Sequence, residues 1–115
     1  MLVSRIIAKE LKKNNIKDIF MLTGYGSMYL NDAIEKEKIN FYASRNEAAA
    51  PMMAEAYAKA RNSLGAVCVT AGPGATNALP GLAEAFVDSA PVIIISGQVE
   101  KKNSADNSKN LKLRT

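Results

Sequence analysis

Four short apolar segments alternate with helical patterns along this chain, and this alternation limits its possible folds more than any other feature. The third segment is rich in β-branched residues and apolar on both faces, as expected of a strand covered on both sides of a sheet. Parallel strands need such crossover connections, so the order predicts an α/β fold with a three-layer parallel sheet flanked by helices on both faces. The predicted strands are residues 18–23, 39–44, 65–71 and 91–96.

The helical patterns carry their own expectations. Leu2, Ile6, Ile7 and Leu11 recur at helical spacing before Asn14 ends the pattern. In the second helix, we expect Ser27 to cap the first turn and the helix to bury its apolar side chains. The last helix is expected to run from about residue 76 to residue 88, with a proline in its first turn. The apolar residues expected inside the second helix are Met28, Leu30 and Ile34.

Composition excludes several kinds of chemistry. The chain has 115 residues, enough for one domain with a single core, and it contains no histidine and one cysteine, Cys68. An internal disulfide and a Ser–His or Cys–His catalytic pair are therefore excluded, and a zinc site is not expected. The longest strongly apolar run, residues 91–97, is too short to cross a bilayer. No cleavable signal is recognised at the start, so we expect a cytoplasmic protein with no membrane partner.

The net charge of +4 raises the question of a nucleic-acid partner. Basic residues are spread over helical faces and the tail, without an accompanying aromatic recognition motif, so we expect no nucleic-acid binding. From residue 100 onward the sequence is polar and lacks periodicity. We therefore predict a folded domain over residues 1–99 and a polar loop or linker over residues 100–115.

Two glycine loops resemble nucleotide-binding motifs only in part. Gly24 and Gly26 supply G-x-G, but Tyr29 stands where the dinucleotide motif needs its third glycine. The loop at residues 72–77 has Asn77 in that position, and Pro73 removes a backbone N–H that a phosphate would need. A nucleotide-binding domain is thus disfavoured, although both loops are predicted to lie at the carboxyl edge of the sheet, where such folds bind ligands.

A single glutamate, Glu47, stands at the head of an almost wholly apolar helical segment. Ser44 and Glu47 match the S-x-x-E capping box, which would give Glu47 a structural role only. With Ser44 as the cap, however, Pro51 would lie seven residues along and cost the helix about 3 kcal/mol. With Asn46 as the cap, Pro51 lies near the first turn, and Glu47 is the first helical residue, free to point outward from the sheet edge. The residues alone leave both interpretations open.

The helix behind Glu47, residues 48–60, is made mostly of alanine and methionine and is apolar nearly all around its axis. A helix of this kind is buried on more than its sheet-facing side. In so small a domain, the second face has to meet another domain or subunit, and we expect an interface there.

The order of these elements resembles the N-terminal pyrimidine-binding domain of thiamine diphosphate-dependent enzymes of the acetolactate synthase-like group. The resemblance is nearest to members often associated with surface-polysaccharide gene clusters and extends from Val3 to about Arg114. It depends on four segments, IKDIFMLTGYGSMYLNDAI, RNEAAAPMMAEAYAKA, VTAGPGATNALPGLAEAFVDSAPVIIISGQV and, more loosely, NLKLR.

The resemblance implies a role for Glu47. In such enzymes, the glutamate at this position hydrogen-bonds N1′ of the cofactor's aminopyrimidine and promotes the imino tautomer that deprotonates the thiazolium C2. The activated C2 then attacks the carbonyl of a 2-keto acid such as pyruvate, in lyase or transferase reactions. By the same resemblance, Thr23, Gly24, Pro73 and Asn77 lie along the pyrimidine, and the helix at residues 48–60 packs in a homodimer or higher homo-oligomer.

The chain also departs from the family pattern. Asn46 replaces the histidine that commonly precedes the glutamate, Ala48 replaces the glutamine that follows it, and Tyr25 stands in a loop that is often only glycine. Family members are several-fold longer and bind the diphosphate through Mg²⁺ in a domain absent from this chain, where no metal-ligand cluster is recognised.

We therefore predict a pyrimidine-binding half-site, present as a fragment or split subunit and inactive alone. It would be completed by a diphosphate-binding domain in the same longer chain or in a partner chain. The alternative is a non-catalytic binding or assembly module that retains the fold.

Overall fold

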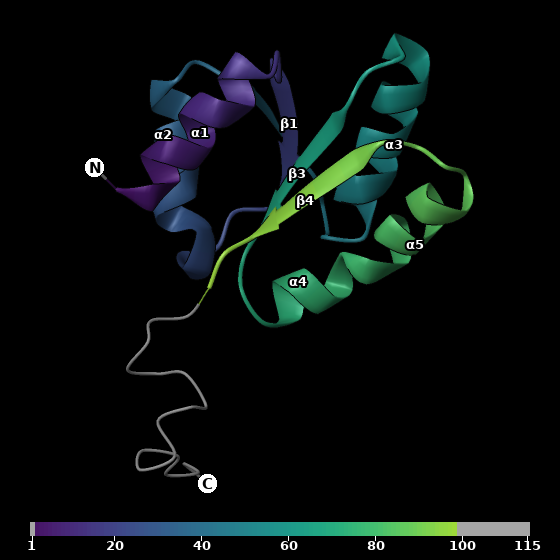
Figure 1. Cartoon of the computed structure of the whole chain (residues 1–115). Coiled ribbons are helices and arrows are strands. Elements are labelled where there is room, and N and C mark those ends of the chain that lie inside the picture. Colours follow the sequence, from purple (N-terminus) through teal and green to yellow (C-terminus); the bar gives the residue numbers. More distant parts are fainter. Residues whose placement is uncertain (1, 99–115) are drawn as a thin grey trace, which may run out of the picture.

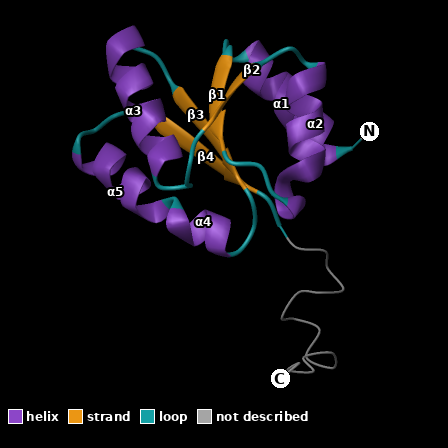
Figure 2. Cartoon of the chain, turned by 180° about the vertical axis from the view of Figure 1, so that it is seen from behind, coloured by secondary structure: helices purple, strands orange, loops and turns teal. Residues whose placement is uncertain are grey.

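The computed structural model describes residues 2–98, which form one parallel sheet between two layers of helices (Figure 1). The strand order is β2-β1-β3-β4, with every neighbouring pair parallel. Figure 2 shows α1 and α2 on one face of the sheet and α3 and α5 on the other. The predicted three-layer α/β fold is confirmed. The strands are β1 (Asp18–Met21), β2 (Asn40–Ala43), β3 (Gly65–Val69) and β4 (Val92–Ser96), and the helices are α1 (Val3–Lys13), η1 (Tyr25–Ser27), α2 (Met28–Lys36), α3 (Ala49–Arg61), α4 (Pro73–Asn77) and α5 (Leu79–Val87).

The interior strands are the most deeply buried. Every residue of β1 and β3 is buried, so the sequence-based expectation that the third strand is covered on both faces is confirmed. Alternate residues of these strands contribute to two separate cores, one on each face of the sheet. Beneath α1 and α2, the core includes Ile19 and Cys68, whereas beneath α3 it includes Phe20 and Val67.

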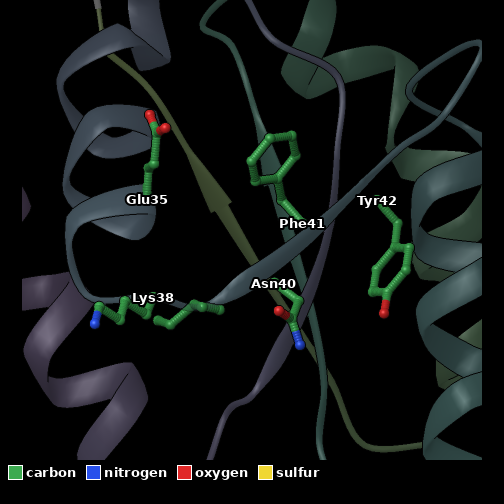
Figure 3. Close-up of a pocket in the computed structure, with 6 residues that line it drawn as sticks. Glu35, Lys38, Asn40, Phe41 and Tyr42 are labelled. Atoms are coloured by element: carbon green, nitrogen blue, oxygen red, sulfur yellow. The ribbon is translucent and has the colours of Figure 1, made fainter.

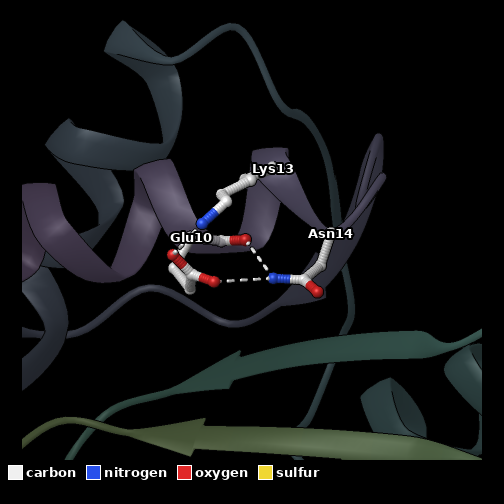
Figure 4. A network of polar contacts seen from close by, with 3 residues as sticks. All are labelled: Glu10, Lys13 and Asn14. Carbon is white, nitrogen blue, oxygen red and sulfur yellow. Dashed lines mark hydrogen bonds and ion pairs between the residues drawn. The ribbon is translucent and has the colours of Figure 1, made fainter.

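The end of α1 is fixed by Asn14, as the sequence pattern predicted (Figure 4). The side-chain amide of Asn14 donates to the backbone oxygen of Glu10 at 2.8 Å and to its carboxylate at 3.0 Å. Asn15 then takes a positive φ of 62°, which turns the chain out of the helix toward β1. An exposed ion pair of 3.9 Å between Lys13 and Glu10 lies beside this cap and adds little to stability.

Two expectations about the second helix are wrong. Ser27 does not cap α2 with its side chain, because the preceding turn η1 brings its hydroxyl to the Gly24 carbonyl oxygen, to which it donates at 3.1 Å. Met28 is exposed, since it lies on the side of α2 that faces away from the sheet, whereas Leu30 and Ile34 are buried as expected.

The helix expected from about residue 76 to residue 88 is in fact two helices, α4 and α5. Pro80 has no N–H to donate to the preceding turn, so a continuous ladder of hydrogen bonds cannot pass this point. Ala78 marks the junction, and its N–H donates to the Ala75 oxygen in a tighter turn at 3.2 Å.

No helix among residues 2–98 is both long and apolar enough to cross a membrane. The predicted loop at residues 100–115 lies outside the described residues, so the boundary at residue 99 stays a prediction.

Candidate functional site

Three loops meet at the carboxyl edge of the sheet, where open α/β folds bind ligands. They follow β1, β2 and β3, and because β1 lies between the other two strands, the loops after β2 and β3 approach one another across it. Every candidate residue named from the sequence lies on one of these loops or on the short helix α4 that follows β3.

The loop after β2 presents Glu47 at the head of α3. The side-chain oxygen of Asn46 accepts a hydrogen bond from the N–H of Ala49 at 2.9 Å, so Asn46 provides the cap. The Ser44 hydroxyl donates instead to the Asn46 carbonyl oxygen at 2.7 Å, and the capping box does not form. The hydrogen bonds thus favour Asn46 over Ser44 as the residue that satisfies the start of the helix, although the N-cap position of α3 is Ala48. Pro51 is the third residue of α3, where no helical N–H bond is lost.

One detail of this prediction is wrong. Regular helix begins at Ala49, so Glu47 lies in the turn before α3 and is not its first helical residue. Glu47 is half-buried, which places its carboxylate at the edge between the protein interior and solvent. A carboxylate held there can accept a hydrogen bond from a bound molecule without first leaving a buried ion pair.

Asn77 lies next to Glu47 although 30 residues separate them in the chain. The Asn77 amide donates to Glu47 Oε2 over 3.4 Å, a long hydrogen bond that orients the carboxylate without neutralising it. The other oxygen, Oε1, faces Gly74, where a Cβ would lie 3.5 Å away. The side-chain position of Gly74 is taken up by Thr70, whose Cγ2 would lie 2.5 Å from that Cβ, so glycine lets this loop pack closely beside the carboxylate.

The remaining candidates are distributed along the same edge. Gly24, after β1, packs against Thr70, which in turn contacts Gly74. Pro73 is the first residue of α4 and is exposed, as is Thr23 in the loop after β1. The structure thus brings Glu47 and Asn77 into direct contact and joins Gly24 to them through Thr70.

Sequence reasoning did not single out Thr70. Its only signal was the surrounding glycine pattern, because glycine in a loop often marks a close approach of another part of the chain. Which residue makes that approach depends on the strand order, and the pattern alone does not provide it.

This edge offers two polar side chains to a ligand, those of Glu47 and Asn77. Recognition of a flat heteroaromatic ring calls for an acceptor, a donor and a low surface on which the ring can lie. Glu47 provides the acceptor and Asn77 an amide, whereas the side-chain positions of Gly24 and Gly74 are filled by Thr70. Among residues 2–98, no group of three or more His, Cys, Asp or Glu side chains is placed to hold a metal ion.

A separate hollow of about 400 Å³ runs along the outer strand β2, away from these candidates (Figure 3). Phe41 and Tyr42 project to opposite sides of the strand, and Glu35 and Lys38 come from the end of α2 and the turn after it. None of the candidate residues lines this hollow, so it is not part of the site at the carboxyl edge.

Comparison with known proteins shows which family this chain is similar to. The acetolactate synthase large subunit of Lactococcus lactis subsp. lactis (strain IL1403) is 41% identical over 97 residues, covering 84% of this chain and 17% of that protein. The large subunit of Cyanidium caldarium is 42% identical over 95 residues, covering 79% of this chain and 16% of that protein. The mitochondrial catalytic subunit of Saccharomyces cerevisiae acetolactate synthase is 38% identical over 96 residues, covering 83% of this chain and 14% of that protein.

The chain thus spans about a sixth of the length of these relatives. The model of the family described as "Thiamine pyrophosphate enzyme, N-terminal TPP binding domain" matches residues 1–112, nearly the whole sequence. The resemblance noted in the sequence is therefore confirmed, and the chain belongs to the family of N-terminal TPP-binding domains of thiamine pyrophosphate enzymes.

Proposed function

We propose that this chain forms the pyrimidine-binding half of the site of a thiamine diphosphate-dependent enzyme that acts on a 2-keto acid, with decarboxylation or carboligation of the acetolactate synthase type. The observation that carries this proposal is the contact of Glu47 with Asn77 beside Gly74 at the carboxyl edge of the sheet. Family membership implies the cofactor, and this geometry provides the groups that its ring needs.

In this proposal, Glu47 would hold the ring nitrogen N1′ by a hydrogen bond in which the carboxyl group and the ring share one proton. The Asn77 amide donates to Oε2 and so favours one orientation of the carboxylate. Gly24 and Gly74 let their loops pack closely on Thr70 beside the ring, and Thr23 and Pro73 border it. When bound, thiamine diphosphate supplies the nucleophilic carbon and the electron sink that 2-keto acid chemistry requires.

Asn46 replaces the histidine common in the family, and its side chain already accepts the Ala49 N–H. An amide committed to a helix cap does not take up or release protons in the physiological range. We therefore propose that proton transfer at this end of the cofactor depends on Glu47 alone.

We further propose that the diphosphate and Mg²⁺ are held by another domain, in the same longer polypeptide or in a partner chain. The domain would cover residues 1–99, with residues 100–115 leading toward that partner, and it would be inactive by itself in the cytoplasm. A ring held through Glu47 without its diphosphate anchor lacks the positioning on which catalysis depends.

Association is expected through the outer face of α3. Met52 and Met53 are partly exposed there, and Phe86 and Val87 of α5, which packs beside α3, are more than three-quarters exposed. Apolar side chains gathered on adjacent helices are typical of a protein interface. We propose that a second copy of the chain covers this face.

This interface is tested by Met53→Glu, with Lys36→Glu on the opposite layer as the matched control. Sedimentation should show a smaller assembly for the first variant and the wild-type mass for the second. An unchanged mass for Met53→Glu would exclude α3 from the interface.

The proposed function is tested by Glu47→Gln in the complete enzyme. The control is Glu35→Gln, at an exposed residue of α2. Gln preserves the shape but not the charge, so proton exchange at C2 of bound cofactor should slow by about 100-fold or more. The control should exchange like the wild type. Unchanged exchange in Glu47→Gln would reject the assigned role of Glu47.

The alternative, a non-catalytic binding or assembly module, is favoured by Asn46 and Ala48 in place of the usual histidine and glutamine. It predicts that Glu47→Ala assembles normally and loses no function. A nucleotide-binding domain would instead require measurable binding of NAD or ATP, which its incomplete glycine motifs do not favour.

A further inference from the structure

Thr70 occupies the point at which the two glycine loops of the site meet. A Cβ added at Gly24 would lie 2.5 Å from Thr70 Cβ, and one added at Gly74 would lie 2.5 Å from Thr70 Cγ2. At Gly26, a Cβ would lie 3.0 Å from Thr70 Oγ1. The separations at Gly24 and Gly74 are shorter than real Cβ contacts allow, so the two loops can close around Thr70 only because glycine stands at these two positions. The contact at Gly26 is tight, and its nearest atom is Ala71 Cβ at 2.9 Å.

Hydrogen bonds stabilise this junction in addition to the packing contacts. The Gly26 N–H donates to Thr70 Oγ1 at 3.0 Å, which ties the first glycine loop to the end of β3. The Ser96 hydroxyl donates to the Thr70 carbonyl oxygen at 3.3 Å, and the Gly97 N–H donates to the Val69 oxygen at 2.9 Å. Thr70 is thus bonded to the loop after β1 and to the end of β4.

The two branches of the Thr70 side chain contact different loops. The hydroxyl binds the backbone at Gly26, whereas the methyl group packs against Gly74. Glu47 Oε1 lies near the same point, 3.5 Å from where a Cβ of Gly74 would be. A shift of Thr70 would therefore move the backbone that lies beside the carboxylate as well as the loop that carries Gly24.

We infer that Thr70 is a positioning residue that sets the spacing between the two glycine loops and hence the seat of the pyrimidine ring beside Glu47. This inference rests on the proposed function, because it assumes that the ring lies between these loops. Thr70 does not touch the ring in this account and acts through Gly26 and Gly74.

The test compares Thr70→Val and Thr70→Ser in the complete polypeptide. Valine keeps the branched shape but removes the acceptor of the Gly26 N–H, whereas serine keeps the hydroxyl and removes the methyl group. Thr76→Val is the matched control, because Thr76 is exposed and its hydroxyl donates only within α4, to Pro73. Three quantities are measured: amide hydrogen exchange at Gly26, affinity for thiamine diphosphate by calorimetry, and C2 proton exchange at saturating cofactor.

For Thr70→Val, we expect faster exchange at Gly26 and about tenfold weaker binding of thiamine diphosphate, as for the loss of one well-placed hydrogen bond. At saturating thiamine diphosphate, the rate of proton exchange at C2 of the bound cofactor should also fall several-fold. Thr70→Ser should restore Gly26 protection and most of the affinity. A residue needed only for stability would not change C2 exchange once the cofactor is bound.

Two results would overturn the inference in distinguishable ways. If Thr70→Val binds thiamine diphosphate and exchanges C2 like the wild type, Thr70 has no positioning role while the proposed function stands. If the wild-type polypeptide binds no thiamine diphosphate, the proposed function fails, and the positioning role fails with it.

Discussion

Tyr57 provides the sharpest test of how the sheet and α3 are held together. Asp18, the first residue of β1, is only 8% exposed, and each of its carboxylate oxygens is bonded differently. Tyr57 from α3 donates to Oδ2 at 2.7 Å, while Asn40 and Tyr42 from β2 donate to Oδ1 at 3.1 and 3.3 Å. Removing the Tyr57 hydroxyl therefore strips Oδ2 of its bond, whereas removing the Tyr42 hydroxyl leaves Oδ1 bonded to Asn40.

We expect Tyr57→Phe to lower the free energy of unfolding by about 2 kcal/mol, the effect of a lost hydrogen bond to a charged group. The ring contacts of Tyr57 with Phe20 and Arg61 do not need the hydroxyl and should persist. Tyr42→Phe is the matched control and should cost about 0.5–1 kcal/mol, since its bond is longer and shared. Urea unfolding of both variants at pH 7 measures the difference.

The pH dependence checks the cause. The hydrogen bond from Tyr57, helped by those from Asn40 and Tyr42, lowers the pKa of Asp18 against the opposing effect of burial. Because the folded-state pKa is depressed, this stabilisation is present above the pKa of an unfolded aspartate, about 3.9, and is lost as pH falls through the folded-state value. The difference in free energy of unfolding between the wild type and Tyr57→Phe should therefore be smaller at pH 3 than at pH 7. This reasoning would be refuted if Tyr57→Phe and Tyr42→Phe lost the same free energy of unfolding, or if the loss in Tyr57→Phe did not change with pH.

Three further predictions concern packing and ionisation. Gly81→Ala should lower the free energy of unfolding by about 1–3 kcal/mol, because the added Cβ would lie 2.7 Å from the Ala48 carbonyl oxygen. If this variant unfolded at the same urea concentration as the wild type, α5 would have to shift away from α3 without cost. Lys59→Met should lower the urea midpoint, because it leaves the buried Glu55 carboxylate without the ammonium group that pairs with it at 2.6 Å; an unchanged midpoint would mean that this ion pair contributes nothing to stability. Burial raises the pKa of Cys68 to about 12, so at pH 8 a thiol reagent should modify it only after unfolding, and rapid labelling of the folded chain would contradict its burial.

Local elements were largely predictable because their causes are local. The periodicity that ends at Asn14 and the apolar run in β3 both depend on residues within a few positions of each other. The cap at Asn46 was also accessible, since the conflict between Ser44 and Pro51 can be recognised from spacing alone. Ser27 was misassigned because a serine hydroxyl can bond either to the N–H groups of the following helix or to a preceding carbonyl oxygen. Only the turn η1 decides that it donates to Gly24.

By itself, the sequence determined the alternation of strands and helices, the family, and Glu47 as the principal candidate residue. The tertiary structure decided the strand order, and with it the neighbours of Glu47. Thr70 reaches Gly24 because β3 is the neighbour of β1, and Asn77 reaches Glu47 because the segment from α4 to α5 packs beside α3 on one face of the sheet. Such contacts join residues tens of positions apart, and their geometry is set by the packing of whole layers, which no local pattern encodes.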